Sequence, residues 1–191
     1  MAAFELEFSG KSDIGMRRAN NQDSILLNSK NKIFAVADGM GGHSGGEVAS
    51  SLAVKTLEKI FPEVKAEGIA ERISETIRIC NQVIYEQSQA DPKLRGMGTT
   101  LSAAILDDDS VHIGQVGDSR VYMFRNGELF QITEDHSQVY ELLKAGLISE
   151  TNIGTFQKNV ITRSVGYEPE VQVDIFSRKL KKGDRYMICS D

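Results

Sequence analysis

The sequence predicts an α+β domain in which helices are layered on antiparallel sheets. Two amphipathic helical patterns come first, one over residues 47–61 and one that begins at Ile69 and stops at Asp91-Pro92. The apolar segments after residue 100 are shorter and are separated by turn residues, which is typical of hairpin strands. Consecutive helices beside sequential hairpins favour an α+β arrangement over an alternating parallel sheet. A chain of 191 residues is long enough for one such domain.

Strands are predicted before the helices. Phe4, Leu6 and Phe8 alternate with glutamates, which is the period of a half-buried strand. Residues 24–27 form a second apolar stretch, and residues 33–37 are apolar throughout, as expected of a fully buried strand. A glycine-rich loop then leads into the first helix.

The two helices are each expected to bury one face. The stripe of the first helix ends at Pro62, a residue that cannot continue a helix. In the second helix, apolar side chains recur every three or four residues, at Ile69, Ile73, Ile77, Cys80 and Ile84. This spacing predicts a helix that packs against the core and buries Cys80.

Four short strands are predicted next, at residues 100–106, 111–116, 121–124 and 129–133. Asn126-Gly127 separates the last two of them. Both central positions of a tight hairpin turn favour positive φ, so this dipeptide predicts an antiparallel pair.

The last third of the chain begins with a short helix that contains Val139 and ends at Gly146. The polar stretch 149–158 is predicted to be a mobile insert. Two final strands, 171–176 and 185–189, flank a turn that contains Gly183.

Composition excludes several classes of function. The chain carries 22 Lys+Arg against 27 Asp+Glu, a net charge of −5, so it lacks the positive charge that nucleic-acid binding requires. Its two cysteines show no metal-binding or redox spacing, which favours a reducing compartment. We find no export signal and no apolar run of membrane-spanning length, and therefore expect a cytoplasmic protein that binds neither nucleic acid nor membrane.

The glycine-rich loop does not match a nucleotide-binding turn. Counting from Gly39, the pattern G-x-G-x-x-G requires glycine where Ser44 stands, and no Gly-Lys-Ser/Thr follows. The notable residue is Asp38, because a carboxylate at the tip of a buried strand needs a cation or several hydrogen bonds.

Four aspartates share this kind of position at a strand end or tight turn, namely Asp23, Asp38, Asp118 and Asp191. Carboxylate oxygens are the ligands that Mg²⁺ and Mn²⁺ prefer, and carboxylates that converged without a cation would repel one another. Each aspartate also fits an ordinary Asx turn. The spacing leaves both interpretations open, because it does not show that the four converge.

Six segments together carry a family resemblance: SDIGMRRANNQDS (12–24), FAVADGMGGHSGGEVAS (34–50), MGTTLSAAIL (97–106), HIGQVGDSRVYMFRNGELFQITEDHS (112–137), NVITRSVG (159–166) and GDRYMICSD (183–191). In order and spacing they resemble the bacterial PP2C-type (PPM) metal-dependent protein serine/threonine phosphatases. The resemblance extends over nearly the whole chain. It implies a four-layer αββα sandwich, in which two antiparallel sheets are flanked by helices on both faces.

The resemblance implies two Mn²⁺ or Mg²⁺ ions at one end of the sandwich. Asp38 and the carbonyl of Gly39 match the family's bridging position, and Asp23 matches a position that binds mainly through water. Asp191 matches the aspartate of the family's C-S-D-G motif. Asp118 matches the ligand of a third, weakly held metal ion.

The implied reaction is hydrolysis of phosphoserine and phosphothreonine in proteins by a water that bridges the two metal ions. Arg18 matches the arginine that binds the substrate phosphate. His43 is a candidate acid for the departing oxygen, and the alternative is that it hydrogen-bonds within the glycine loop and orients an aspartate. We expect His112 to be structural, and His136 to orient the insert at residues 134–158, which resembles the family's flap.

A cysteine-dependent phosphatase is rejected, because neither Cys80 nor Cys189 begins a C-x₅-R motif. The family pattern continues to a Gly-x-Asp-Asn motif whose aspartate completes the metal site, and residues 1–191 stop before it, so we expect one domain without its last elements. A catalytically silent, phosphatase-like binding or regulatory module is therefore the alternative function. The expected partners are phosphoproteins, including a bacterial serine/threonine kinase or its targets, and we expect a monomer.

Overall fold

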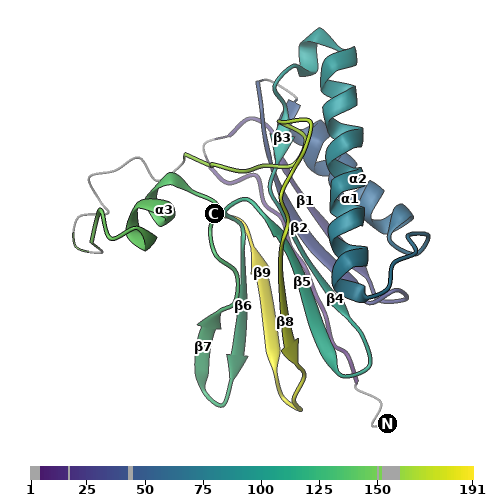
Figure 1. Ribbon diagram of the computed structural model, residues 1–191, viewed down its shortest axis with the longest axis vertical. Helices are drawn as coiled ribbons and strands as arrows, with labels where there is room; N and C mark the ends of the chain where they lie inside the picture. The colour runs from purple at the N-terminus through teal and green to yellow at the C-terminus, as the bar shows by residue number, and fades with distance from the viewer. Residues whose placement is uncertain (1–4, 17, 43–44, 150, 152–159) are drawn as a thin grey trace.

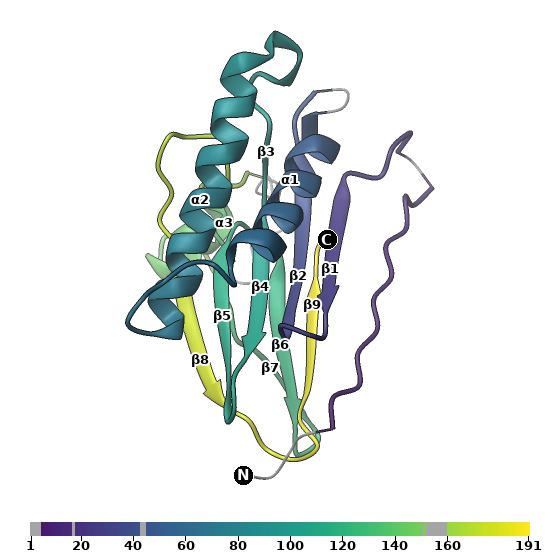
Figure 2. The ribbon, with the colours of Figure 1, turned by 90° about the vertical axis from the view of Figure 1, so that its right-hand side faces the viewer.

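The computed structural model describes residues 5–16, 18–42, 45–149, 151 and 160–191, and within them two antiparallel sheets and three α-helices form stacked layers (Figure 1). Helices α1 (Gly45–Ile60) and α2 (Ile69–Ala90) cover one face of the larger sheet. The smaller sheet lies against the opposite face (Figures 1 and 2). None of the helices described has the length and apolar character needed to cross a bilayer.

The larger sheet has the order β1-β2-β4-β5-β8, with β3 paired to β2, and every pair is antiparallel. Its strands are β1 (Asp23–Asn28), β2 (Ile33–Met40), β3 (Gly98–Thr99), β4 (Leu101–Leu106), β5 (Ser110–Val116) and β8 (Asp174–Lys179). The smaller sheet has the order β7-β6-β9, formed by β7 (Glu128–Gln131), β6 (Arg120–Arg125) and β9 (Arg185–Cys189). A 3-10 helix, η1 (Pro92–Leu94), follows α2, and α3 (Gln138–Lys144) follows β7.

Two apolar clusters hold the layers together. The cluster between the helices and the larger sheet includes Ile33, Leu57, Ile73 and Cys80, all 0 % exposed. The cluster between the sheets includes Ala104 and Val111 of the larger sheet and Val121, Met123 and Ile132 on the side of the smaller one. Gly114 lets α2 approach β5, since a Cβ there would lie only 2.5 Å from Cγ2 of Ile73.

Most of the predicted elements are confirmed. Both helices, the burial of Cys80 and the strands of the central region form where the periodicity places them. Asn126 and Gly127 have φ values of 56° and 87°, as the hairpin turn between β6 and β7 requires. Strand β7 ends two residues before the predicted position 133. Ile132 still donates to the Val121 carbonyl (2.8 Å), but the Val121 amide donates to the Thr133 hydroxyl in place of a backbone carbonyl. Strand β8 begins three residues after the predicted position 171.

The predicted first strand is wrong for the described residues 5–8, which have no strand partner. The ring of Phe8 lies 5.4 Å from that of Phe34, but Phe8 and Leu6 both remain exposed. The alternation of apolar residues therefore reflected neither backbone pairing nor a buried face.

The antiparallel sandwich is confirmed, while helices on both of its faces are not seen in the described residues. There α1 and α2 cover the larger sheet only, and α3 lies on the other side of the molecule (Figure 1). Phe124, Leu129 and Met187 of the smaller sheet remain exposed. The insert predicted at 149–158 lies outside the described residues, except for positions 149 and 151.

Candidate metal centre

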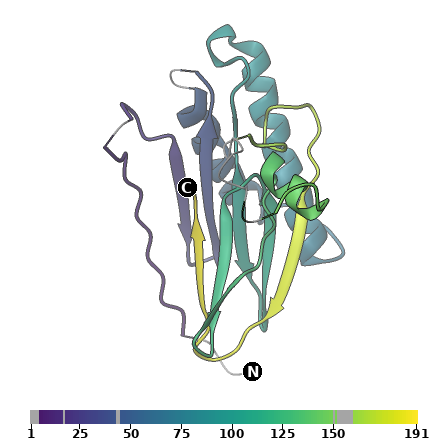
Figure 3. The same ribbon diagram turned by 90° about the vertical axis from the view of Figure 1, so that its left-hand side faces the viewer.

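Four chain segments bring the predicted aspartates to one end of the sandwich. Asp23 and Asp38 are direct partners in the β1–β2 register, so their side chains leave the sheet on the same face. Asp191 follows β9. The end of β9 lies beside β1, where the Ser190 hydroxyl is 3.5 Å from Oδ2 of Asp23. Figures 2 and 3 both show this C-terminus beside β1. Asp118 lies in the turn between β5 and β6.

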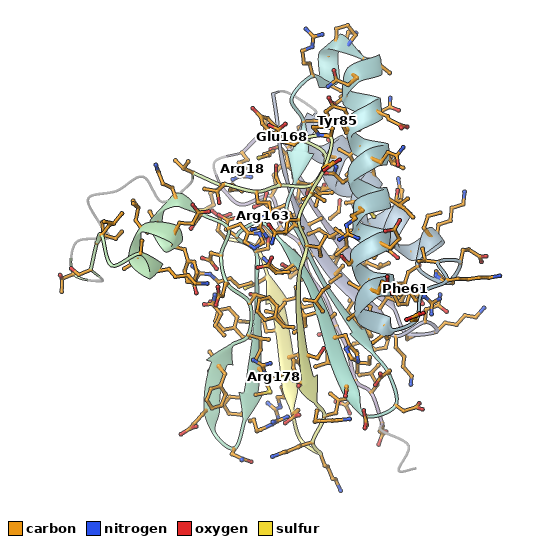
Figure 4. The ribbon with its side chains drawn as sticks, viewed as in Figure 1. Arg18, Phe61, Tyr85, Arg163, Glu168 and Arg178 are labelled. Carbon is orange, nitrogen blue, oxygen red and sulfur yellow. The ribbon has the colours of Figure 1, made fainter. Side chains whose placement is uncertain are left out.

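A cleft of about 890 Å³ opens at this end of the sheets. Its lining includes Arg18, Asp38, Gly39, Asp118 and Asp191. Asp23 lies in an adjoining hollow that shares Arg18, Asp38 and Asp191 with the cleft. Figure 4 shows Arg18 at this end, on the same side as Arg163. The structure therefore brings five of the predicted residues to one opening and a sixth beside it.

The electrostatics of the cluster are unfavourable for carboxylates alone. Burial, with the negative charges of Asp23 and Asp191, raises the pKa of Asp38 to about 7, and the Arg18 guanidinium offsets only part of this. Burial is also the main cause that raises the pKa of Asp118. One carboxylate oxygen, Oδ1 of Asp23, is buried and has no hydrogen-bond partner among the residues that the structure describes.

These residues fit a hard divalent cation. A cation would neutralise the clustered carboxylates and would give the orphaned oxygen of Asp23 a ligand. Within the described ranges, no three Asp, Glu, His or Cys side chains already stand as a compact ligand set. The cluster is thus a group of converging oxygen donors and has no preformed shell of three side chains.

The three histidines differ in their placement. His43, predicted as an acid or an orienting residue, lies outside the described residues. His112 binds Ser177 (2.8 Å) and Asp107 (3.0 Å), which supports its structural assignment. His136 is buried beside Gly117, next to Asp118 in the chain.

A buried polar network that was not predicted from the sequence holds the backbone beside Asp38 and Asp118. The Thr100 hydroxyl accepts the Asp38 amide (2.9 Å) and lies 2.7 Å from the Ser119 hydroxyl. Gln115, 0 % exposed, donates to the carbonyls of Gly117 (3.0 Å) and Ser119 (2.7 Å). The available signal was the glutamine itself, since an amide inside the apolar run 111–116 needs buried partners.

Arg163 also lines the cleft and was missed. It donates to Oδ1 of Asp174 at 2.7 Å, which orders its guanidinium over the opening. Its signal in the sequence was weak, because a single arginine in NVITRSVG is indistinguishable from a surface residue.

Comparison with known proteins places these features in context. A family model described as "Protein phosphatase 2C" matches residues 10–191. "Serine/threonine phosphatase stp" of Listeria monocytogenes is 42 % identical over 189 residues, which are 95 % of this chain and 75 % of that protein. The crystal structure of the Mycobacterium tuberculosis phosphatase PstP/Ppp superposes with a TM-score of 0.85 at 36 % identity, covering 94 % of this chain and 76 % of that one. A second structure, the PstP catalytic domain in complex with two manganese ions, gives a TM-score of 0.83 at 36 % identity and covers 95 % and 75 %.

Proposed function

Because this chain belongs to the protein phosphatase 2C family, we propose that it is a protein serine/threonine phosphatase that uses two Mn²⁺ or Mg²⁺ ions. The observation that carries the proposal is the convergence of aspartates from four segments on the cleft that also holds Arg18. Two manganese ions in the PstP catalytic domain support the choice of cation.

The acidic residues and one backbone carbonyl at the cleft are the proposed metal ligands. Asp38, the Gly39 carbonyl, Asp23 and Asp191 are the proposed ligands of the two ions, and Asp118 is the proposed ligand of a third. When bound, the two ions supply a water of lowered pKa and neutralise charge on the phosphoryl oxygens. The oxygen donors of this set are hard, as such cations require.

Arg18 is the proposed phosphate-binding residue. Its guanidinium lines both hollows, and a planar fork of N–H donors matches two phosphoryl oxygens at once. The cleft has a volume of about 890 Å³, which is larger than a phosphorylated side chain. His43 stays a prediction for the acid that protonates the leaving oxygen.

The test is Mn²⁺-dependent release of phosphate from a phosphothreonine peptide. We expect Asp38→Asn to abolish turnover and Asp108→Asn to retain it, because Asp108 is exposed in the β4–β5 turn at the opposite end of the sheet. Turnover that persists in Asp38→Asn, or in excess chelator, would contradict the assignment. No turnover at any Mn²⁺ concentration would instead favour the silent binding module.

Metal binding also has a thermodynamic signature that needs no substrate. An ion that binds only the folded state at a hundredfold excess over its Kd raises the free energy of unfolding by about 2.7 kcal/mol. We expect this stabilisation in the wild type and in Asp108→Asn, and its loss in Asp38→Asn. An unchanged wild-type melting temperature on Mn²⁺ addition would argue against a functional site.

A further inference from the structure

The turn that carries Asp118 is held by His136 through two hydrogen bonds. The Gly117 amide donates to Nδ1 of His136 at 3.0 Å, and the His136 amide donates to the Gly117 carbonyl at 3.0 Å. Gly117 has φ +101°, and a Cβ there would lie 2.6 Å from the side chain of Thr100. The turn is therefore tightly packed, and its Gly117 amide is satisfied by this one imidazole nitrogen among the contacts of the described residues.

The hydrogen bond from Gly117 decides which ring nitrogen carries the proton. A backbone N–H only donates, so Nδ1 must be the acceptor and the neutral imidazole is protonated on Nε2. Nε2 then donates to Oδ2 of Asp174 at 3.2 Å. Nη1 of Arg163 lies 3.1 Å from the same Nε2, but a guanidinium only donates, so with Nε2 protonated its hydrogen bond goes to Oδ1 of Asp174 at 2.7 Å. Burial and the nearby Arg163 guanidinium lower the pKa of His136, in agreement with a neutral ring.

The second anchor of the turn lies one residue before His136. The side chain of Asp135 is 8 % exposed and accepts hydrogen bonds from Arg120. Nε of Arg120 lies 2.9 Å from Oδ1 and 3.0 Å from Oδ2 of Asp135, and Nη2 lies 2.5 Å from Oδ2. Residues 135 and 136 thus hold the turn on both sides of Asp118, at Gly117 and at Arg120. The same segment is tied to the base of the insert, because the Thr162 amide donates to the His136 carbonyl at 2.9 Å.

We infer that His136 is a positioning residue whose Nδ1 acceptor sets the place of Asp118 in the cleft. This role goes beyond orienting the insert, because the ring contacts the amide adjacent to Asp118 itself. Without the acceptor, the buried Gly117 amide would be unsatisfied and the turn would shift to hydrate it. The consequence for catalysis rests on the proposed phosphatase function, whereas the hydrogen bond to Gly117 does not.

A pair of variants separates the two sides of the imidazole. In His136→Asn the amide oxygen replaces Nδ1 and keeps an acceptor for Gly117, whereas in His136→Gln the amide reaches the position of Nε2 and leaves Gly117 without one. We expect hydrogen exchange of the Gly117 amide in metal-free protein to accelerate about tenfold or more in His136→Gln, and to stay near the wild-type rate in His136→Asn. His112→Asn, which alters the histidine bound to Asp107 and Ser177, is the control and leaves Gly117 protected.

We expect the catalytic parameters to change in His136→Gln and to stay near the wild-type values in His136→Asn. His136→Gln should lower kcat and raise the Mn²⁺ concentration for half-maximal activity with little change in the KM for the peptide, and His136→Asn should restore both. Equal exchange rates and equal activities in the two variants would overturn the inference, since a packing role treats both alike.

Nitrogen-15 NMR of the wild type tests the inference without any variant. A bare Nδ1 and a protonated Nε2 on His136 are expected, and a proton on Nδ1 would refute the inference directly. If the wild type shows no metal-dependent turnover, the phosphatase proposal fails, while the exchange rate of Gly117 still decides whether His136 positions the turn.

Discussion

Replacing Asn81 with alanine should detach the loop that forms one wall of the cleft. Asn81 belongs to α2 and is 1 % exposed. Its Oδ1 accepts the Gly166 amide at 2.6 Å, and its Nδ2 donates to the carbonyls of Glu168 (3.0 Å) and Pro169 (3.1 Å). The Asn81 side chain therefore supplies hydrogen-bond partners for three backbone groups of this loop.

The magnitude follows from these three hydrogen bonds. Each contributes about 1 kcal/mol net, so their sum is about 3 kcal/mol. In Asn81→Ala, one water molecule in the vacated space can bridge the three backbone groups, which restores part of the lost free energy of unfolding. We expect Asn81→Ala to lower the free energy of unfolding by about 2 kcal/mol, or the Tm by about 4 to 8 °C for a domain of this size.

The assay is thermal or urea unfolding with two further variants. Gln82 is the next residue in the helix, is exposed and donates to Glu86, so Gln82→Ala should change stability by less than about 0.5 kcal/mol. Asn81→Asp keeps the acceptor but turns a carboxylate towards two carbonyls, and it should be at least as destabilising as alanine. If Asn81→Ala were as stable as Gln82→Ala, the three hydrogen bonds of Asn81 would not hold the loop at residues 166–169.

Three further predictions concern the packing and hydrogen bonding of the two sheets. Arg125 holds the pKa of Asp184 below its usual range, so wild-type stability should fall as the pH drops below about 4, and Asp184→Asn should be less stable at pH 7 with a shallower acid dependence in urea titrations. Gly114→Ala should cost about 1 to 3 kcal/mol, and its combination with Ile73→Ala should cost less than the sum of both, as a double-mutant cycle measures. Thr100→Val leaves the backbone amide of Asp38 without its acceptor and should cost about 1 to 3 kcal/mol, whereas Thr100→Ser should retain stability in thermal unfolding.

Features that depend on neighbouring residues alone were predictable from the sequence. The period of α2 placed Cys80 in the core because a helix repeats its contacts every three to four residues. Asn126-Gly127 predicted its hairpin because the required φ values belong to those two residues. The alternation of Phe4, Leu6 and Phe8 misled, because a strand also needs a partner edge, which no local pattern specifies.

The site shows the same division. Each of the four aspartates could be found from the sequence, because each stands at a strand end or turn. Their convergence could not, because the register of β1 on β2 and the position of β9 beside β1 join residues more than 160 positions apart in the chain. Their support by Thr100, Gln115 and His136 also depends on the tertiary structure, because a buried hydrogen-bond partner is chosen by proximity in space and leaves no periodic trace in the sequence.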